Sequence, residues 1–99
     1  MAALDDFARL SGKLFLDGAL VASKAAARLD VIEPATEDRI GEIADATDAE
    51  VDQAVDIADR ARRKWCAQDT RTRATTLHEV AATLRRSKEA YAECLTREE

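Results

Sequence analysis

The sequence is poor in the residues that build cofactor and metal sites. It contains three glycines, one histidine, one proline and two cysteines among 99 residues. A dinucleotide fingerprint or a phosphate-binding loop needs several closely spaced glycines, because only then can backbone amides approach phosphate. The glycines here stand far apart, at Gly12, Gly18 and Gly41. We therefore expect no cofactor-binding residue in this chain.

The side chains that could carry chemistry are isolated from one another. His78 has no second histidine or paired cysteine at ligand spacing, so it is best interpreted as an ordinary helix residue. Cys66 follows a basic run and Cys94 lies beside an apolar stripe, with no CxxC spacing, so both are expected to be reduced thiols. A serine or threonine nucleophile would need an oriented base. We predict no catalytic and no metal-binding residue.

Large apolar residues are also few. Leu, Ile, Val and Phe supply 20 of the 99 residues, close to the level of roughly 20% below which chains tend toward disorder. A chain of this length buries only about two-thirds of the surface that it exposes when unfolded. We therefore expect thin stability, loose folding or self-association of the isolated chain, and apolar faces that need a partner surface.

Charge of each sign is concentrated in its own block. Residues 30–59 carry eleven acids and one base, whereas residues 60–88 carry nine bases and two acids, within a net charge of −5. The basic block has no aromatic stacking platform beyond Trp65, which argues against nucleic acid. No apolar run approaches the roughly 20 residues of a membrane span, and Met1–Ser11 lacks the apolar core of a secretory signal. We predict a cytoplasmic chain with no nucleic-acid or membrane partner.

Two β-hairpins are predicted over residues 13–43, after an N-terminal tail of residues 1–12. Asp17-Gly18 between two apolar runs favours a two-residue turn, because both turn positions need positive φ. Pro34 and Thr36–Asp38 supply the turn residues of the second hairpin. The four strands are expected at Lys13–Leu16, Ala19–Ala22, Arg28–Glu33 and Arg39–Ile43.

An antiparallel pair of helices is predicted next, at about residues 47–66 and 70–98. Thr47 and Glu50 have the spacing of a capping box, and the acids of residues 45–59 fall mostly on the solvent side of the first helix. Trp65 is expected to anchor the pair. The chain reaches Glu99 without a C-cap glycine, so its end looks cut. The apolar stripes are Val51, Ala54, Val55, Ala58, Ala61 and Trp65, then Ala74, Leu77, Val80, Ala81, Leu84, Tyr91 and Leu95.

The order of these pieces resembles the N-terminal end of the NAD(P)-dependent aldehyde dehydrogenase superfamily, over about residues 13–99. Glu33 stands where the family usually has Asn before Pro34, and Glu37 where it usually has Gly. The segments that carry the resemblance are Leu14–Gly18, Leu29–Thr36, Ile40–Ile43, Ala46–Val55, Trp65, Arg73-Ala74 and Leu77.

The resemblance implies an α+β fragment of an α/β enzyme of several hundred residues that oxidises an aldehyde to a carboxylic acid. The family's catalytic Cys, Glu and Asn and its nucleotide fingerprint would lie beyond position 99. NAD or NADP is implied for the full-length enzyme, and none for this chain alone. Some members hold a monovalent cation partly through backbone carbonyls, which here would be Val31 and Ile32, but we assign no metal site. The implied partners are the remainder of the chain and further copies in a homo-oligomer.

Three interpretations are open at this point. The chain is an inactive, structural N-terminal segment of an aldehyde dehydrogenase, with residues 13–99 as an incomplete part of its cofactor-binding domain. Alternatively, it is a small acidic helical interaction module, or an unrelated helical domain. A structure without the two hairpins would favour the last of these.

Overall fold

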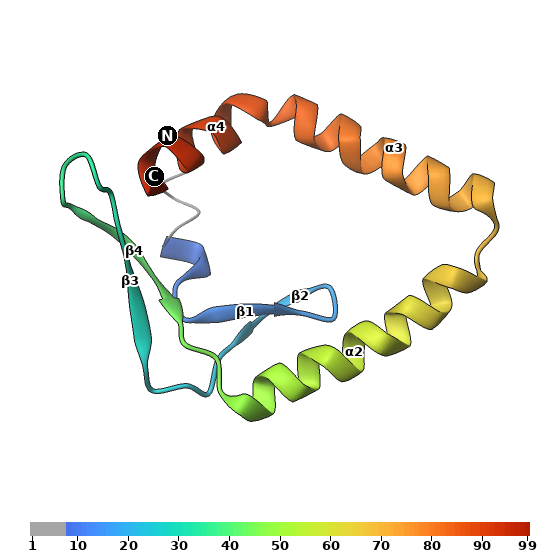
Figure 1. The fold of residues 1–99 in the computed structure, drawn as a ribbon, viewed down its shortest axis with the longest axis horizontal. Coiled ribbons are helices and arrows are strands. Elements are labelled where there is room, and N and C mark those ends of the chain that lie inside the picture. The colour runs from blue at the N-terminus through green and yellow to red at the C-terminus, as the bar shows by residue number, and fades with distance from the viewer. Residues whose placement is uncertain (1–7) are drawn as a thin grey trace.

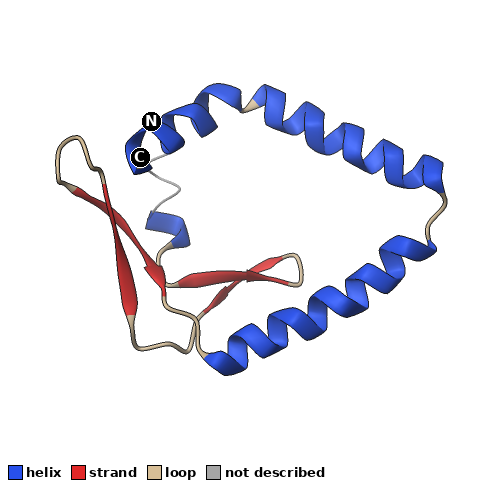
Figure 2. Cartoon of the chain, viewed as in Figure 1, coloured by secondary structure: helices blue, strands red, loops and turns tan. Residues whose placement is uncertain are grey.

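The fold is an open ring of two β-hairpins followed by helices, which confirms the predicted α+β order (Figure 1). The structure is a computed structural model that describes residues 8–99, so most of the tail predicted for residues 1–12 lies outside the described residues. Each hairpin forms a separate two-stranded antiparallel sheet. Figure 2 shows both sheets on one side of the ring and the long helices on the other.

The first hairpin pairs β1 (Lys13–Leu16) with β2 (Ala19–Ala22), at the predicted bounds. Asp17 has φ 51° and Gly18 has φ 77°. Both turn residues therefore have the positive φ that a two-residue turn matching the strand twist requires. This part of the prediction is confirmed.

The second hairpin pairs β3 (Arg28–Ile32) with β4 (Arg39–Ala44), and its register shifts between Val31 and Ile32. The strand predicted to reach Glu33 ends one residue earlier, because Glu33 belongs to the turn. The Glu33 amide donates to the Asp38 carbonyl at 2.9 Å, and the Glu37 amide donates to the Glu33 carbonyl at 2.8 Å. The turn holds Glu37 at φ 62°, a left-handed conformation that favours glycine.

Helix α2 (Asp48–Ala67) begins with the predicted capping box. The Glu50 amide donates to Oγ1 of Thr47 at 3.2 Å, and the Thr47 amide donates to Oε2 of Glu50 at 3.0 Å. Acids in the first turn and Lys64 in the last turn complement the helix dipole.

The Glu50 carboxylate also joins α2 to the first hairpin, which the capping-box prediction did not include. It accepts the Lys24 amide at 2.7 Å and the Ser23 hydroxyl at 2.9 and 3.1 Å. Glu50 and Ala25 are each 8% exposed and form the buried part of the described chain. Most acids of residues 45–59 are solvent-exposed as expected, but Glu50 is an internal contact.

The helix predicted over residues 70–98 is wrong in its continuity, since it is two helices, α3 (Thr70–Arg86) and α4 (Lys88–Glu98). Ser87 interrupts it with φ −105° and ψ 16°. Its amide is shared between the carbonyls of Thr83 and Leu84, each at 3.2 Å. Serine is a poor residue for a helix interior, because its hydroxyl competes for backbone partners.

A long-range ion pair between α4 and the second hairpin closes the ring, and within residues 8–99 only Ala25 and Glu50 are buried. Arg97 of α4 binds Oε2 of Glu33 through Nε at 3.2 Å and Nη2 at 3.1 Å. Helices α2 and α3 run in opposite directions but diverge from their connection (Figure 1). The radius of gyration is 16.5 Å, whereas a compact chain of this length has about 13 Å.

We predict that Glu37→Gly stabilises the chain. A left-handed φ costs a non-glycine residue about 1–2 kcal/mol, and glycine adopts it without a Cβ clash, although it loses more entropy on folding. Thermal unfolding followed by circular dichroism should show a higher Tm for the variant, where Tm is the temperature at which half of the signal is lost. Glu79→Gly, at an exposed position inside helix α3, is the control and should lower the Tm, because glycine is unfavourable in a helix interior. A lower Tm for Glu37→Gly would contradict the prediction.

We predict that stability falls in acid largely through Glu50. Hydrogen bonds from the Lys24 and Thr47 amides hold the pKa of Glu50 below its ordinary value of 4.5. A lowered folded-state pKa contributes stability above the ordinary value, and this contribution is lost as the pH falls through the lowered value. The Tm of Glu50→Gln should therefore depend less on pH between about pH 5 and pH 3 than that of the original chain.

Asp69 adds a slope of the same sign, so Glu50→Gln should reduce the pH dependence without abolishing it. The Thr72 amide and hydroxyl lower the pKa of Asp69 at the N-cap of α3. Asp56→Asn, on the exposed side of α2, is the control and should keep the original slope. Equal slopes for the Glu50 variant and the original chain would contradict the prediction.

Candidate functional site

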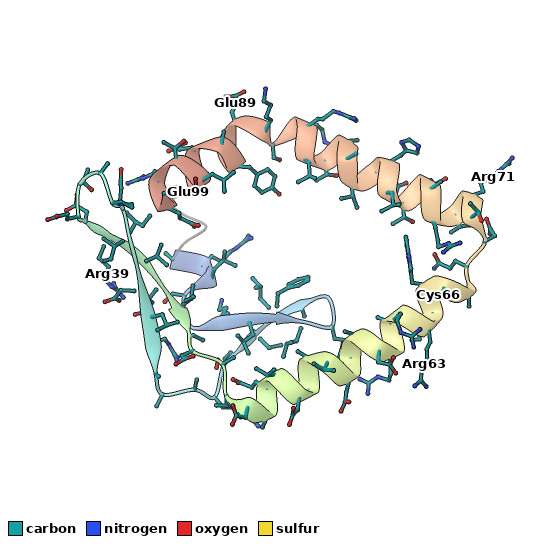
Figure 3. All side chains as sticks on the ribbon, viewed as in Figure 1. Arg39, Arg63, Cys66, Arg71, Glu89 and Glu99 are labelled. Atoms are coloured by element: carbon teal, nitrogen blue, oxygen red, sulfur yellow. The ribbon has the colours of Figure 1, made fainter. Side chains whose placement is uncertain are left out.

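The structure does not bring the candidate reactive side chains together. Cys66 is exposed in the last turn of α2 (Figure 3). Cys94 is half-buried in α4, and both thiols are free. His78 is exposed on α3. Within residues 8–99 no three metal-binding side chains gather at one place. The described surface therefore offers no convergent set of groups for nucleophilic or metal-assisted chemistry.

The glycines serve the backbone. Gly18 lies in the first hairpin turn, and Gly12 has φ 65° just before β1. A Cβ on Gly12 would approach the Arg28 guanidinium to 3.1 Å, so this glycine makes room for a side chain that reaches back across the hairpins. Arg28 uses that room to donate to the Ala25 and Ala27 carbonyls. None of this geometry cradles a phosphate.

An apolar groove lies between the first hairpin and α2. Its volume is about 350 Å³. Its walls are strongly exposed for apolar residues: Phe15 is 71% exposed, Val51 51% and Val55 62%. The groove is lined by Leu14, Phe15, Leu16, Ala46, Glu50, Val51, Ala54, Val55 and Ala58.

Helices α3 and α4 carry a second uncovered apolar stripe. It consists of residues that the sequence placed on one face, and each is about half exposed. A single exposed leucine needs no explanation, but a continuous row at helical spacing marks a contact surface. The stripe contains Leu77, Val80, Leu84, Tyr91 and Leu95.

Trp65 lies where α2 meets α3, as predicted for an anchor of the helix pair. It lines a hollow of about 260 Å³ together with Thr70, Arg73, Ala74 and Leu77. Nε of Arg73 is buried there without a hydrogen-bond partner in the described part of the chain. The contact is confined to this corner, because the helices diverge beyond it (Figure 1).

Several charged side chains lie on the outer side of the ring. Arg63, Arg71 and Glu89 point away from its interior (Figure 3). The side chains of Asp30 and Glu42 flank Arg39, and the hydrogen bond to Asp30 is the main cause that raises the pKa of the guanidinium. Arg62 and Arg63 both bind the Asp59 carboxylate. These exposed pairs contribute little to stability.

The total accessible surface measures how much is left uncovered. The chain exposes 7731 Å², which is about 2,200 Å² more than the roughly 5,500 Å² expected of a compact monomer of its mass. A standard protein–protein interface takes about 800 Å² from each partner. The excess is therefore large enough for an extensive contact with another body.

Sequence reasoning missed two contacts that position these faces. The capping-box spacing identified Glu50 as a cap, but its bonds to Ser23 and Lys24 cross 26 or 27 residues of the chain. The pair of Glu33 and Arg97 crosses 64 residues. The only hint in the sequence was that Glu33 replaces the family's usual Asn.

Comparison with known proteins matches most of the chain to one family. The aldehyde dehydrogenase family profile matches residues 20–99. A probable methylmalonate-semialdehyde/malonate-semialdehyde dehydrogenase (acylating, mitochondrial) of Drosophila melanogaster is 32% identical over 88% of this chain and 17% of its own length. Malonate-semialdehyde dehydrogenase of Listeria monocytogenes is 37% identical over 87% of this chain and 18% of its own length.

A plant relative extends the set. NADP-dependent glyceraldehyde-3-phosphate dehydrogenase of Apium graveolens is 30% identical over 87% of this chain and 17% of its own length. The chain thus spans less than a fifth of the length of these relatives. None of the helices in residues 8–99 combines the length and apolar character needed to cross a membrane.

We predict that the isolated chain unfolds without a single cooperative transition. Its elements share few tertiary contacts, so each helix should melt according to its own caps and side-chain pairs. Trp65 fluorescence reports the corner of α2 and α3, whereas circular dichroism reports all helices. The two probes should give broad transitions with different midpoints. A sharp two-state transition, coincident by both probes and above about 60 °C, would contradict this expectation.

Proposed function

Because this chain belongs to the aldehyde dehydrogenase family, we propose that it is a structural segment of an NAD(P)-dependent aldehyde oxidoreductase and is inactive by itself. Its work is to present two apolar faces to the remainder of such an enzyme. Membership in the family removes the interpretation as an unrelated helical domain.

One observation carries the proposal, namely the large apolar surface left uncovered in a chain whose described residues hold no convergent reactive site. The groove on α2 and the stripe on α3 and α4 have the size of a contact made within a larger fold. The isolated positions of Cys66, Cys94 and His78 support inactivity, since a nucleophile needs an adjacent base or another activating group.

The reaction assigned to the full-length enzyme is oxidation of an aldehyde to an acid. Two of the relatives are named for malonate semialdehyde, which supports a short aldehyde that carries a carboxylate as the substrate class. The plant relative is named as NADP-dependent, and this supports a nicotinamide cofactor held by residues outside this chain. The cofactor, the substrate and the catalytic residues are proposed for the full-length enzyme and not for this chain alone.

Two further parts of the proposal concern the assembly of the full-length protein and its location in the cell. The remainder of the enzyme is the first partner, and a homo-oligomer is proposed for the full-length protein. A cytoplasmic location is proposed on the reduced cysteines, although one relative's name places that relative in mitochondria.

We predict that the purified 99-residue chain binds neither NAD nor NADP and oxidises no aldehyde. It lacks closely spaced glycines that would let backbone amides contact a pyrophosphate. Titration calorimetry with each nucleotide should show no heat of binding, and malonate semialdehyde with NAD or NADP should give no increase in absorbance at the nicotinamide band. Micromolar affinity for either nucleotide would overturn the proposed inactivity.

A further inference from the structure

Helix α2 presents an uncovered apolar row and unpaired charges along the same side. Val51 and Val55 are 51% and 62% exposed. Asp48 and Asp52 are exposed as well, and neither has an ion-pair partner in the described part of the chain. Helical periodicity places Asp48, Asp52, Val55, Asp59 and Arg62 in one row, because they are spaced by three or four residues.

The charges of α2 are divided between its two halves. Its acids occupy the N-terminal part and its bases the C-terminal part, and Arg62 uses Nε and Nη2 for Asp59, which leaves further donors free. The acids are Asp48, Glu50, Asp52, Asp56 and Asp59, and the bases are Arg60, Arg62, Arg63 and Lys64.

This division is self-complementary about the middle of the helix. Asp52 and Arg62 stand five residues on either side of Ile57, about 7.5 Å along the axis in each direction. In an antiparallel pair of α2 helices whose twofold axis crosses them at the level of Ile57, on the side of the helix opposite to the Ile57 side chain, Asp52 of each copy faces Arg62 of the other. The same arrangement places Val51 and Val55 between the two helices.

The surrounding surface accommodates such a neighbour. The groove of about 350 Å³ runs between α2 and β1, and Phe15 stands at its edge, 71% exposed. A standard interface takes about 800 Å² from each partner, well within the excess of about 2,200 Å² over a compact monomer. A twofold contact is also closed, so it ends at two copies.

We propose that the 99-residue chain, when nothing else covers α2, forms a twofold homodimer through antiparallel α2 helices. The apolar groove supplies the contact area, and the two pairs of Asp52 and Arg62 set the direction of the helices. This inference does not rest on the proposed function, because it concerns the chain by itself. A monomeric chain would contradict the proposed dimer and would leave the family assignment unchanged.

Sedimentation equilibrium of the purified chain tests the dimer. The mass should rise with concentration from 10.8 kDa to twice that value and no further. Val55→Glu should raise the dimer dissociation constant by at least about tenfold, since it places a charge at the centre of the contact. Val55 is exposed, so the helix content by circular dichroism should be retained.

Val80→Glu is the control, because Val80 is a valine on α3 that is 51% exposed and lies outside the proposed contact. It should leave the dissociation constant unchanged. Asp52→Arg should weaken the dimer, and adding Arg62→Asp should restore it, because the swapped charges again face their opposites. The dimer dissociation constant should depend more strongly on salt concentration in the original chain than in a variant in which both Asp52 and Arg62 have lost their charge.

Four results would overturn the proposal. They are a monomer at all concentrations, a series of masses beyond two copies, a dimer that survives Val55→Glu, and a loss of dimer in Val80→Glu as large as in Val55→Glu. If any charge-swapped variant loses helix content, Val55→Glu and its Val80 control decide the matter alone.

Discussion

The Glu50 carboxylate is the contact on which the arrangement of the N-terminal half depends. It closes the capping box with Thr47 and, from the same two oxygens, accepts the Ser23 hydroxyl and the Lys24 amide. The end of the first hairpin is thereby fixed to the first turn of α2. A carboxylate is suited to this position because it has several acceptor sites and sits at the positive end of the helix dipole.

The elements were predictable to the extent that local rules specify them. The Asp17-Gly18 turn and the Thr47–Glu50 cap each depend on neighbours within a few residues, and both form as expected. The break at Ser87 escaped prediction because the apolar stripe continues on both sides of it. The long-range contacts of Glu50 and Glu33 escaped because a sequence pattern does not show which distant polar groups meet. The absence of a convergent site was an expectation from composition, and the structure shows only where the isolated side chains lie.

The two departures from the family pattern in the second hairpin have different consequences. Glu37 takes a left-handed conformation that the usual glycine would adopt without strain, so this change costs stability. Glu33 gains a partner, because its half-buried carboxylate binds Arg97. The pair is only 17% and 26% exposed, which removes part of the solvent screening that weakens surface pairs. The turn of the second hairpin is therefore a point of attachment for α4.

The charge pattern of α2 shows why an open ring can persist without a core. Acids at the start and bases at the end favour the helix dipole, and Asp59 with Arg62 and Arg63 adds pairs at helical spacing. Each term is local, so none of them requires the apolar side of the helix to be covered. That side then remains available, with Val51 and Val55 exposed between charges of opposite sign at its two ends. Helix α2 is therefore complementary to a neighbour whose acids and bases run in the opposite order along the contact. That neighbour is either a further part of an enzyme or a second copy of this chain.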